Sequence, residues 1–422
     1  MGRQIRIFEH ERLTLHEDAR GQNLEPSELA RLYDFNDRND NKYFTGIRDG
    51  VKFSSYVGVI QIGGLTIEVL PKSDRERGDE GDAERWHGVL LDMLRICRKV
   101  SVNAVSESNL RRRHHSILEL YFEVYLDEVE QLLRQGLVKK YRRKAGNATS
   151  LKGQILFSQH LQRNLIHQER FYTKHQVYDP VNPINQILLE GLHAVADFTR
   201  SSTLSQRTAQ LIEVFPFHTR QRIEAHHFDR LSDDRGVSRY QRALTIARML
   251  LLHYSPSIQS GKDQMLALLF DMNALWEEYI YRMLVRAATP EFEVRPQQSK
   301  PFWQSHTVRP DIVVTRRDGD SSTTFVIDTK WKVLDSRNPR PTDDDLKQMF
   351  VYNEYWSAGH SMLLYPTTYE REEVMGHYWS QDEEGKKLHS CKLAFVSVLG
   401  DDGKLNLNIG QTIFERLRGI VY

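Results

Sequence analysis

The sequence predicts three regions: a β-rich amino-terminal subdomain, a mainly helical middle region, and an α/β carboxy-terminal domain in which helices flank a mixed central sheet. Three observations support this. With 422 residues, the chain exceeds what one hydrophobic core usually organises. Apolar residues alternate at period two near residue 60 and recur at helical spacing after about residue 84. From about residue 262, helical and strand patterns alternate, which is typical of an α/β domain.

The composition is that of a globular protein, with 40% hydrophobic and 27% charged residues. No apolar run is long enough to cross a bilayer, and the start lacks the apolar core of a secretory signal, so we expect a cytoplasmic protein. Cys97 and Cys391 form no CxxC motif, which argues against a disulfide framework and a structural zinc site. The net charge of +1 does not by itself demand a nucleic-acid partner.

The amino-terminal subdomain, residues 1–75, contains a predicted hairpin over residues 56–70. Apolar residues at alternate positions flank Gly63-Gly64, a pair that favours a tight turn, and they fall on one face of each strand. The stretch at 73–82 is charged and contains glycine, so it has nothing to bury. It predicts a linker at the edge of the subdomain.

The middle region, residues 84–260, is predicted to be mainly helical. Its first helix has the i, i+3, i+4, i+7 spacing of one buried face, with Trp86, Val89, Leu90, Met93, Leu94 and Cys97. A second helix is expected over about 116–135, ended by Gly136, and others near 184–200 and 239–254.

The carboxy-terminal domain, residues 262–422, is predicted to begin with a helix. The expected order is a helix over 265–287, strands over 291–298, 308–315 and 324–331, a helix over 343–357 and a strand over 362–365. The last connection runs from strand to helix to strand, which predicts a partly parallel sheet.

Two of these strands form a predicted antiparallel hairpin that brings two aspartates together. The turn-forming sequence at 317–320 separates the strands. If the turn centres between Gly319 and Asp320, paired positions sum to 639, and Asp311 then lies opposite Asp328. Their Cβ atoms would be roughly 5 Å apart, which suits two carboxylates that share a divalent cation.

Lys330 follows Asp328 by two residues and is therefore expected on the same face of the strand. Hard oxygen ligands with open positions favour Mg²⁺, with Mn²⁺ as a possible substitute. We expect Asp311, Asp328 and the backbone carbonyl of Thr329 as metal ligands. Such a centre suits hydrolysis of a phosphodiester, with Lys330 orienting the attacking water and stabilising the developing charge.

An alternative is that both aspartates are solvated positions on an amphipathic hairpin and that Lys330 is a surface residue. Asp328, however, directly follows the apolar run Phe325-Val326-Ile327 and is followed closely by Trp331. A charged side chain placed there would be buried or crowded, which costs free energy unless an interaction compensates it. This placement favours the functional interpretation.

Three flanking residues are further site candidates. Glu277 lies at the margin of the apolar helix stripe Met272, Trp276, Tyr279 and Met283, and it is the candidate for an additional acid. Gln348 and Tyr352 share one helix face, where they could touch a phosphate or the lysine. Each of the three could instead be a solvated residue on a helix surface.

These motifs resemble the McrC subunit of McrBC-type modification-dependent restriction systems, in a nearly full-length match. The carboxy-terminal part resembles its nuclease domain, of the PD-(D/E)xK type, in ordered blocks: Phe270-Asp271-Met272-Asn273, Leu275-Trp276-Glu277, Arg309-Pro310-Asp311, Ile327-Asp328-Thr329-Lys330 and Gln348-Met349-Phe350-Val351-Tyr352. Residues 56–60 and 67–72 are similar to its amino-terminal signature. The family pattern favours Glu277 over Glu278 as the additional acid, although the sequence leaves that choice open.

The resemblance implies a Mg²⁺-dependent endonuclease subunit of a GTP-dependent complex in a bacterium or archaeon. Its partner would be a hexameric McrB-like AAA+ GTPase that recognises modified double-stranded DNA, and the amino-terminal subdomain would bind this motor and stimulate its GTP hydrolysis. The chain has no GxxxxGK[ST] loop, so nucleotide hydrolysis would occur on another chain.

Two other functions remain open: an adaptor that activates an NTPase and has a degenerate nuclease fold, and a stand-alone repair-type nuclease on the same fold. The basic clusters at 111–115 and 139–144 could contact phosphates or an acidic motor surface. Alternatively, they are solvated helix ends and loops.

Overall fold

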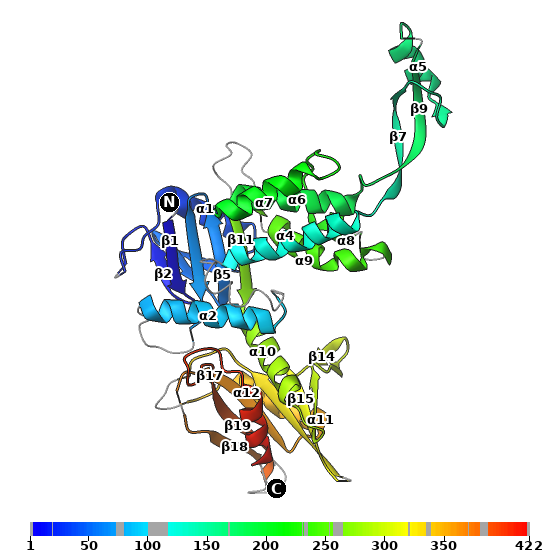
Figure 1. The fold of residues 1–422 in the computed structure, drawn as a ribbon. Coiled ribbons are helices and arrows are strands. Elements are labelled where there is room, and N and C mark those ends of the chain that lie inside the picture. The colour runs from blue at the N-terminus through cyan, green and yellow to red at the C-terminus, as the bar shows by residue number, and fades with distance from the viewer. Residues whose placement is uncertain are drawn as a thin grey trace. The chain divides into compact units, whose positions relative to one another are not determined.

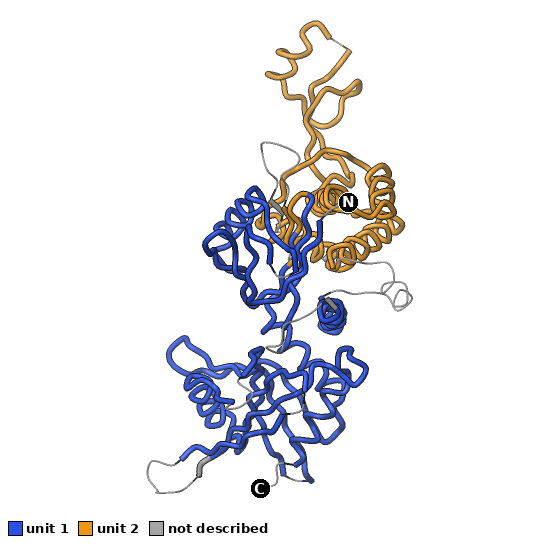
Figure 2. The backbone as a smooth tube through the Cα atoms, turned by 90° about the vertical axis from the view of Figure 1, so that its left-hand side faces the viewer, with its two compact units in different colours: residues 1–60, 64–103, 269–422 blue, residues 61–63, 104–268 orange. Residues whose placement is uncertain are grey.

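The computed structural model describes residues 3–18, 20–72, 80–99, 117–167, 169–229, 231, 235–252, 254–255, 265–319, 321–334, 339–369, 371–379 and 387–419. The chain forms two compact units (Figure 2). The first comprises residues 1–60, 64–103 and 269–422, and the second comprises residues 61–63 and 104–268. Most of the predicted linker at 73–82 and all of the basic cluster at 111–115 lie outside the described residues. Within them, no helix is both long and apolar enough to span a membrane.

The amino-terminal part is β-rich, as the sequence predicts. A five-stranded sheet has the order β1 (Arg3–Phe8), β6 (Leu65–Leu70), β5 (Tyr56–Ile62), β11 (Met265–Asp271) and β10 (Tyr254–Ser255). A smaller sheet joins β2 (Arg12–Thr14), β4 (Gly50–Phe53) and β3 (Phe44–Ile47), and the helices are α1 (Pro26–Asp37) and α2 (Glu80–Ile96). The predicted hairpin is confirmed as β5 and β6, but both of its faces are buried. Apolar residues occupy consecutive positions in β5, and in β6 the polar Thr66 and Glu68 are buried as well.

The prediction of one helix over 265–287 is wrong in its first part. Residues Met265–Asp271 form strand β11, and helix α10 begins at Met272 and ends at Ala287. Asp271 is the N-cap, and its carboxylate accepts a hydrogen bond from Asn273 N–H at 2.9 Å. A continuous apolar run suits a buried strand and a buried helix equally well, which is why periodicity did not separate them.

The second unit is mainly helical, with α4 (Ile117–Gln135), α6 (Pro183–Phe198), α7 (Ser202–Glu213), α8 (Ala225–Asp229), the 3₁₀ helix η2 (Arg235–Tyr240) and α9 (Gln241–Leu252). The helices expected near 116–135, 184–200 and 239–254 are thereby confirmed. Gly136 follows α4 with a φ of 83°, a left-handed conformation that favours glycine and ends a helix.

An antiparallel arm in this unit was not predicted. Strands β7 (Lys140–Ala148) and β9 (Phe171–Asp179) pair along their length and carry β8 (Gln154–Ile155) and helix α5 (Phe157–Asn164) (Figure 1). The basic residues at 140–144 lie in strand β7, which excludes the alternative that they belong to a helix end or a loop. The alternation of apolar and polar residues along β7 is weak because most of the side chains of this strand contact solvent.

The carboxy-terminal domain contains a mixed six-stranded sheet. Its order is β12 (Phe292–Pro296), β15 (Ile312–Asp318), β16 (Ser321–Thr329), β17 (His360–Thr367), β19 (Lys387–Ser397) and β18 (Val374–Trp379). β17 runs parallel to both β16 and β19, as the predicted strand-helix-strand connection requires, and the other pairs are antiparallel. Helix α11 (Asp343–Trp356) contacts β16, β17 and β19, whereas α10 contacts β12, β16 and α12 (Ile409–Arg418).

Residues 308–315 were predicted as a single strand, but β15 begins only at Ile312. Residues His306–Val308 instead form β14, which pairs with β13 (Lys300–Trp303) in a separate hairpin. The break falls at Pro310, which has no N–H to donate to a sheet.

Candidate active site

The β15–β16 hairpin has the predicted register. Its pairs run from Ile312 opposite Ile327 to Asp318 opposite Ser321, so the two residue numbers of every pair add up to 639. Asp311 directly precedes β15, and Asp328 lies in β16. Continuing the register by one residue places the two aspartates at opposed positions at the open end of the hairpin.

The Asp311 carboxylate is oriented by its neighbour on β16. Thr329 donates two hydrogen bonds to Asp311 Oδ2, from its backbone N–H at 2.7 Å and from its hydroxyl at 2.9 Å. Because both bonds end on one carboxylate oxygen, they fix the direction in which the carboxylate points.

Asp328 is only 2% exposed and forms an ion pair with Lys330, whose Nζ lies 2.8 Å from Asp328 Oδ2. The same ammonium lies 3.3 Å from Asp345 Oδ1 and donates a hydrogen bond to Gln348 Oε1 at 3.1 Å. Two carboxylates and an amide therefore surround the lysine.

Burial raises the pKa of Asp328, and the neighbouring charge of Asp311 raises it further. Burial also raises the pKa of Asp311, and the hydrogen bonds from Thr329, which lower this pKa, only partly offset it. Burial alone would lower the pKa of Lys330, but the charges of Asp328 and Asp345 outweigh it and the net shift is upward. Lys330 is therefore a cation at neutral pH, and the centre is rich in negative charge that a divalent cation would neutralise.

Sequence reasoning missed Asp345. It is 7% exposed and occupies the third position of α11, where it forms a capping box with Thr342. Besides Lys330, it contacts Lys332 at 3.6 Å. The signal was present in the sequence, since a residue three before Gln348 lies on the same helix face.

Gln348 and Tyr352 both lie beside this cluster, but only Gln348 touches the lysine. Gln348 Nε2 donates to the Tyr352 hydroxyl at 2.8 Å, and that hydroxyl donates to the backbone carbonyl of Arg309 at 2.9 Å. Burial raises the pKa of Tyr352 to about 12, so it remains protonated. Tyr352 thereby ties α11 to the segment that leads into Asp311.

Glu277 and Glu278 have different surroundings. Burial raises the pKa of Glu277, and the charge of Asp311 raises it further, while its carboxylate accepts a hydrogen bond from Gln297 Nε2 at 2.6 Å. Glu278 instead forms an ion pair with Arg282 at 2.6 Å, one helical turn later. Glu277 is the one whose charge acts on the aspartate pair.

The donor set suits Mg²⁺. No group of three or more His, Cys, Asp or Glu side chains positioned to hold a metal is found in the described part of the chain. Mg²⁺ keeps several waters and needs only one or two carboxylates from the protein. Asp311 and Asp328 would supply two, and a bound cation would relieve their mutual repulsion.

Comparison with solved structures supports the fold. The chain is similar to a chain in the refined half-complex from a tetradecameric assembly of Thermococcus gammatolerans McrB AAA+ hexamers with bound McrC. The sequence identity is 18% and the TM-score is 0.68, and the match covers 99% of this chain and 100% of that chain. A second structure, of the Thermococcus gammatolerans McrBC complex, matches over 67% of this chain and 88% of its own at 18% identity and a TM-score of 0.48, too low to support an argument.

One curated relative matches over a short stretch. Coatomer subunit beta of Trypanosoma brucei brucei is 28% identical over 127 residues, which is 30% of this chain and 13% of that protein. The chain thus matches only a small part of that relative's length, and no function follows from it.

A family model identifies the family. The model described as McrBC 5-methylcytosine restriction system component matches residues 51–366, more than half of the chain and a range that includes Glu277, Asp311, Asp328, Lys330 and Tyr352. The McrC resemblance inferred from the motifs agrees with this match. The chain belongs to the McrBC 5-methylcytosine restriction system component family.

Proposed function

We propose that the chain is the Mg²⁺-dependent endonuclease subunit of a GTP-dependent complex that cuts modified double-stranded DNA. The observation that carries the proposal is the buried Asp328 carboxylate, opposed to Asp311 and 2.8 Å from Lys330 Nζ. A buried acid pair with a lysine is costly to a fold unless it binds a ligand.

In this proposal Asp311, Asp328 and the backbone carbonyl of Thr329 hold the metal, and Mn²⁺ could replace Mg²⁺. When bound, the cation polarises the scissile phosphate and acidifies a water. Lys330 remains charged and stabilises the charge that develops on the phosphoryl oxygens. Thr329 orients Asp311, whereas Asp345 and Gln348 hold the lysine ammonium in place.

Glu277 is proposed as an additional acid beside the metal, because its charge acts on Asp311. Gln348 and Tyr352 are proposed to position Lys330 and the segment before Asp311. They act through those groups and do not transfer protons, which fits the raised pKa of Tyr352.

The proposed partner is a McrB-like AAA+ GTPase hexamer. The structurally similar assembly contains McrB AAA+ hexamers with bound McrC, and this chain has no phosphate-binding GxxxxGK[ST] loop of its own. The arm also exposes apolar side chains, among them Phe157 at 71% and Ile166 at 89% exposure. Exposed apolar clusters commonly mark protein interaction surfaces. The amino-terminal subdomain remains a second proposed contact with the motor.

The experiment is DNA cleavage by the chain together with its AAA+ partner, modified DNA, GTP and Mg²⁺. Cleavage is expected to stop when Mg²⁺ is chelated, to return with Mn²⁺, and to be lost in Asp328→Asn. Glu278→Gln is the matched control, since Glu278 is adjacent in sequence but pairs with Arg282 of the same helix. Cleavage by Asp328→Asn at the wild-type rate would overturn the proposal, and equal cleavage without GTP or partner would instead support a stand-alone nuclease.

A further inference from the structure

Trp331, the residue after Lys330, is hydrogen-bonded to the amino-terminal sheet. Its indole Nε1–H donates to Glu9 Oε1 at 2.6 Å, across 322 positions of sequence within the first compact unit. No sequence motif predicts this contact. It joins the segment that carries the proposed catalytic lysine to the end of strand β1.

Glu9 is held firmly on its own side. Its backbone N–H donates to Leu70 O at 2.9 Å, and its Oε1 also accepts a hydrogen bond from Lys72 N–H at 2.8 Å. The residue is 1% exposed. One carboxylate oxygen therefore receives donors from the segment after β6 and from the segment after β16, and its geometry is fixed by strands β1 and β6.

The other carboxylate oxygen is not committed to this arrangement. Among the described residues no hydrogen bond reaches Glu9 Oε2, and His10 Nε2 lies 3.8 Å away. Satisfying both oxygens of a buried carboxylate usually takes several hydrogen bonds. The hydrogen bonds to the Glu9 carboxylate are therefore concentrated on Oε1, the oxygen that accepts from the Trp331 indole.

Trp331 in turn lies close to two site residues. Lys330 N–H donates to Leu364 O at 2.9 Å, so Lys330 is held by the sheet on one side, while the 4% exposed Trp331 fixes it on the other. The Trp331 ring packs on Trp276 with centroids 5.3 Å apart, and Trp276 precedes Glu277 on α10. A shift of the Trp331 indole would therefore move both Lys330 and the helix that carries Glu277.

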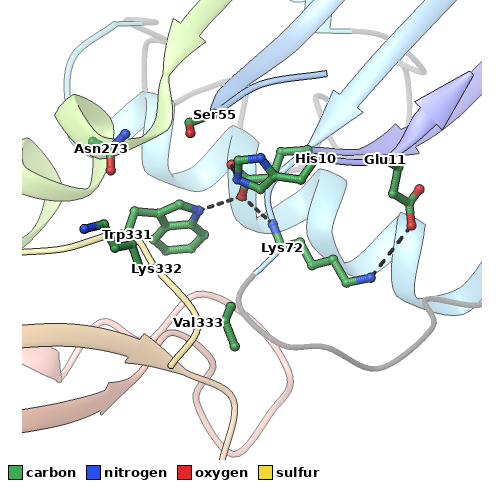
Figure 3. Close-up of a pocket in the computed structure, with 9 residues that line it drawn as sticks. His10, Glu11, Ser55, Lys72, Asn273, Trp331, Lys332 and Val333 are labelled. Carbon is green, nitrogen blue, oxygen red and sulfur yellow. Dashed lines mark hydrogen bonds and ion pairs between the residues drawn. The ribbon is translucent and has the colours of Figure 1, made fainter. Parts of the chain in front are cut away.

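The Glu9–Trp331 contact borders a pocket, although the Trp331 side chain itself is almost fully buried. The pocket has a volume of about 620 Å³, and Figure 3 shows Trp331 and Lys332 on one side of it and His10, Glu11 and Lys72 on the other. Trp331 is thus not enclosed on all sides by packed side chains. Without its acceptor, the indole could change position toward this space.

We propose that Glu9 is a positioning residue of the nuclease centre: its carboxylate anchors Trp331 and so holds Lys330, and it links the amino-terminal sheet to that centre. The role of Lys330 rests on the proposed function, but the Glu9–Trp331 contact does not. A displacement of the end of β1 would move Trp331 through its hydrogen bond to Glu9, and Trp331 is the next residue after Lys330.

The test uses the full chain with ¹⁵N-labelled tryptophan, which gives one indole resonance for each of its six tryptophans. The Trp331 resonance is assigned by its loss in Trp331→Phe. Glu9→Ala is expected to shift this resonance in the absence of DNA, metal and partner. Glu9→Gln keeps an acceptor oxygen, so it should leave the resonance close to its wild-type position.

In the complete complex, Glu9→Ala is expected to lower kcat roughly 10-fold to 100-fold, the range that a misplacement of about 1 Å costs, with KM for DNA nearly unchanged. Glu9→Gln should restore kcat. Trp331→Phe keeps a buried aromatic ring but removes the donor together with part of the ring volume, so it should remain folded and lose at least as much kcat. Combining it with Glu9→Ala should add no further loss, because both remove one interaction.

Glu11→Gln is the matched control, because Glu11 lines the same pocket but pairs with Arg20 and Lys72. The proposal is overturned if Glu9→Ala leaves the Trp331 resonance unmoved, or if its kcat equals that of Glu11→Gln. If Asp328→Asn also cuts like the wild type, the proposed function fails instead, while the indole shift still reports the contact.

Discussion

Asp345 Oδ1 lies 3.3 Å from Lys330 Nζ, so the proposed catalytic lysine shares its charge between Asp328 and a carboxylate on α11. Asp345→Asn keeps a side-chain oxygen to accept from Thr342 at the helix start but removes the charge. We expect DNA cleavage to fall roughly 10-fold, the scale of a small misplacement of a catalytic group, and less than in Lys330→Ala.

The control for this change is Asp344→Asn, whose side chain is 96% exposed and pairs only loosely with Lys347, at 3.8 Å. Single-turnover cleavage rates measure both variants. Equal rates for Asp345→Asn and Asp344→Asn would show that Asp345 does not hold the lysine.

The raised pKa values of Asp311 and Asp328 predict a pH-dependent stability without metal. The carboxyls favour protonation in the folded state, so their contribution to the free energy of unfolding is present below their ordinary pKa and is lost as pH rises through the folded pKa. At the proposed site Mg²⁺ would bind the ionised pair. It should therefore raise the melting temperature more at about pH 8 than at about pH 5.

Differential scanning fluorimetry with and without Mg²⁺ measures this difference. In Asp328→Asn the extra stabilisation at higher pH should disappear, because one ligand and one titrating group are removed together. A Mg²⁺-dependent increase of the same size at both pH values, or in the variant, contradicts the assignment of the metal to this pair.

Glu277 and Glu278 are adjacent and should behave differently when neutralised. Glu277→Gln removes the negative charge that acts on Asp311, so we expect weaker Mg²⁺ binding and a higher Mg²⁺ requirement for cleavage. Glu278→Gln removes a partly buried ion pair with Arg282 and leaves the charge that acts on Asp311 in place. Titrating cleavage rate against Mg²⁺ separates the two, and identical curves would exclude Glu277 as the additional acid.

The apolar side chains of the arm should contribute to partner binding and little to folding. Ile166→Ser, at a residue 89% exposed, is expected to change the free energy of unfolding by less than about 0.5 kcal/mol. It should weaken association with the AAA+ partner, measured by analytical ultracentrifugation. Val214→Ser, 65% exposed and outside the arm, is the control. If both variants bind alike, the arm is not the contact surface.

The hairpin register could be predicted from sequence because a turn signal and alternating strands fix the pairing by arithmetic, and the pairs of β15 and β16 agree with it. Helices α4, α6 and α11 were predictable because their apolar residues recur at helical spacing and start or stop signals mark their ends. Strand β11 was not, because its apolar run is continuous and has no period that separates a strand from a helix.

Contacts between distant segments could not be predicted in the same way. The β7–β9 arm lacks an apolar face. Strands β18 and β19 and helix α12, which all lie beyond residue 365, were not predicted either. Asp345 was not recognised because it is one of three consecutive aspartates at the start of a helix, where acidic residues are common without any role in a site. The Glu9–Trp331 hydrogen bond depends on tertiary packing and has no local signal.

The most direct test of the nuclease centre measures DNA cleavage and GTP hydrolysis in the same reaction, with Lys330→Ala in complex with the AAA+ partner. Lys330 lies with Asp328 and Asp345 and is not on the arm proposed to bind the motor. We predict that cleavage of modified DNA is lost while the partner's GTPase is stimulated as by the wild type. Cleavage at the wild-type rate by this variant would contradict the account.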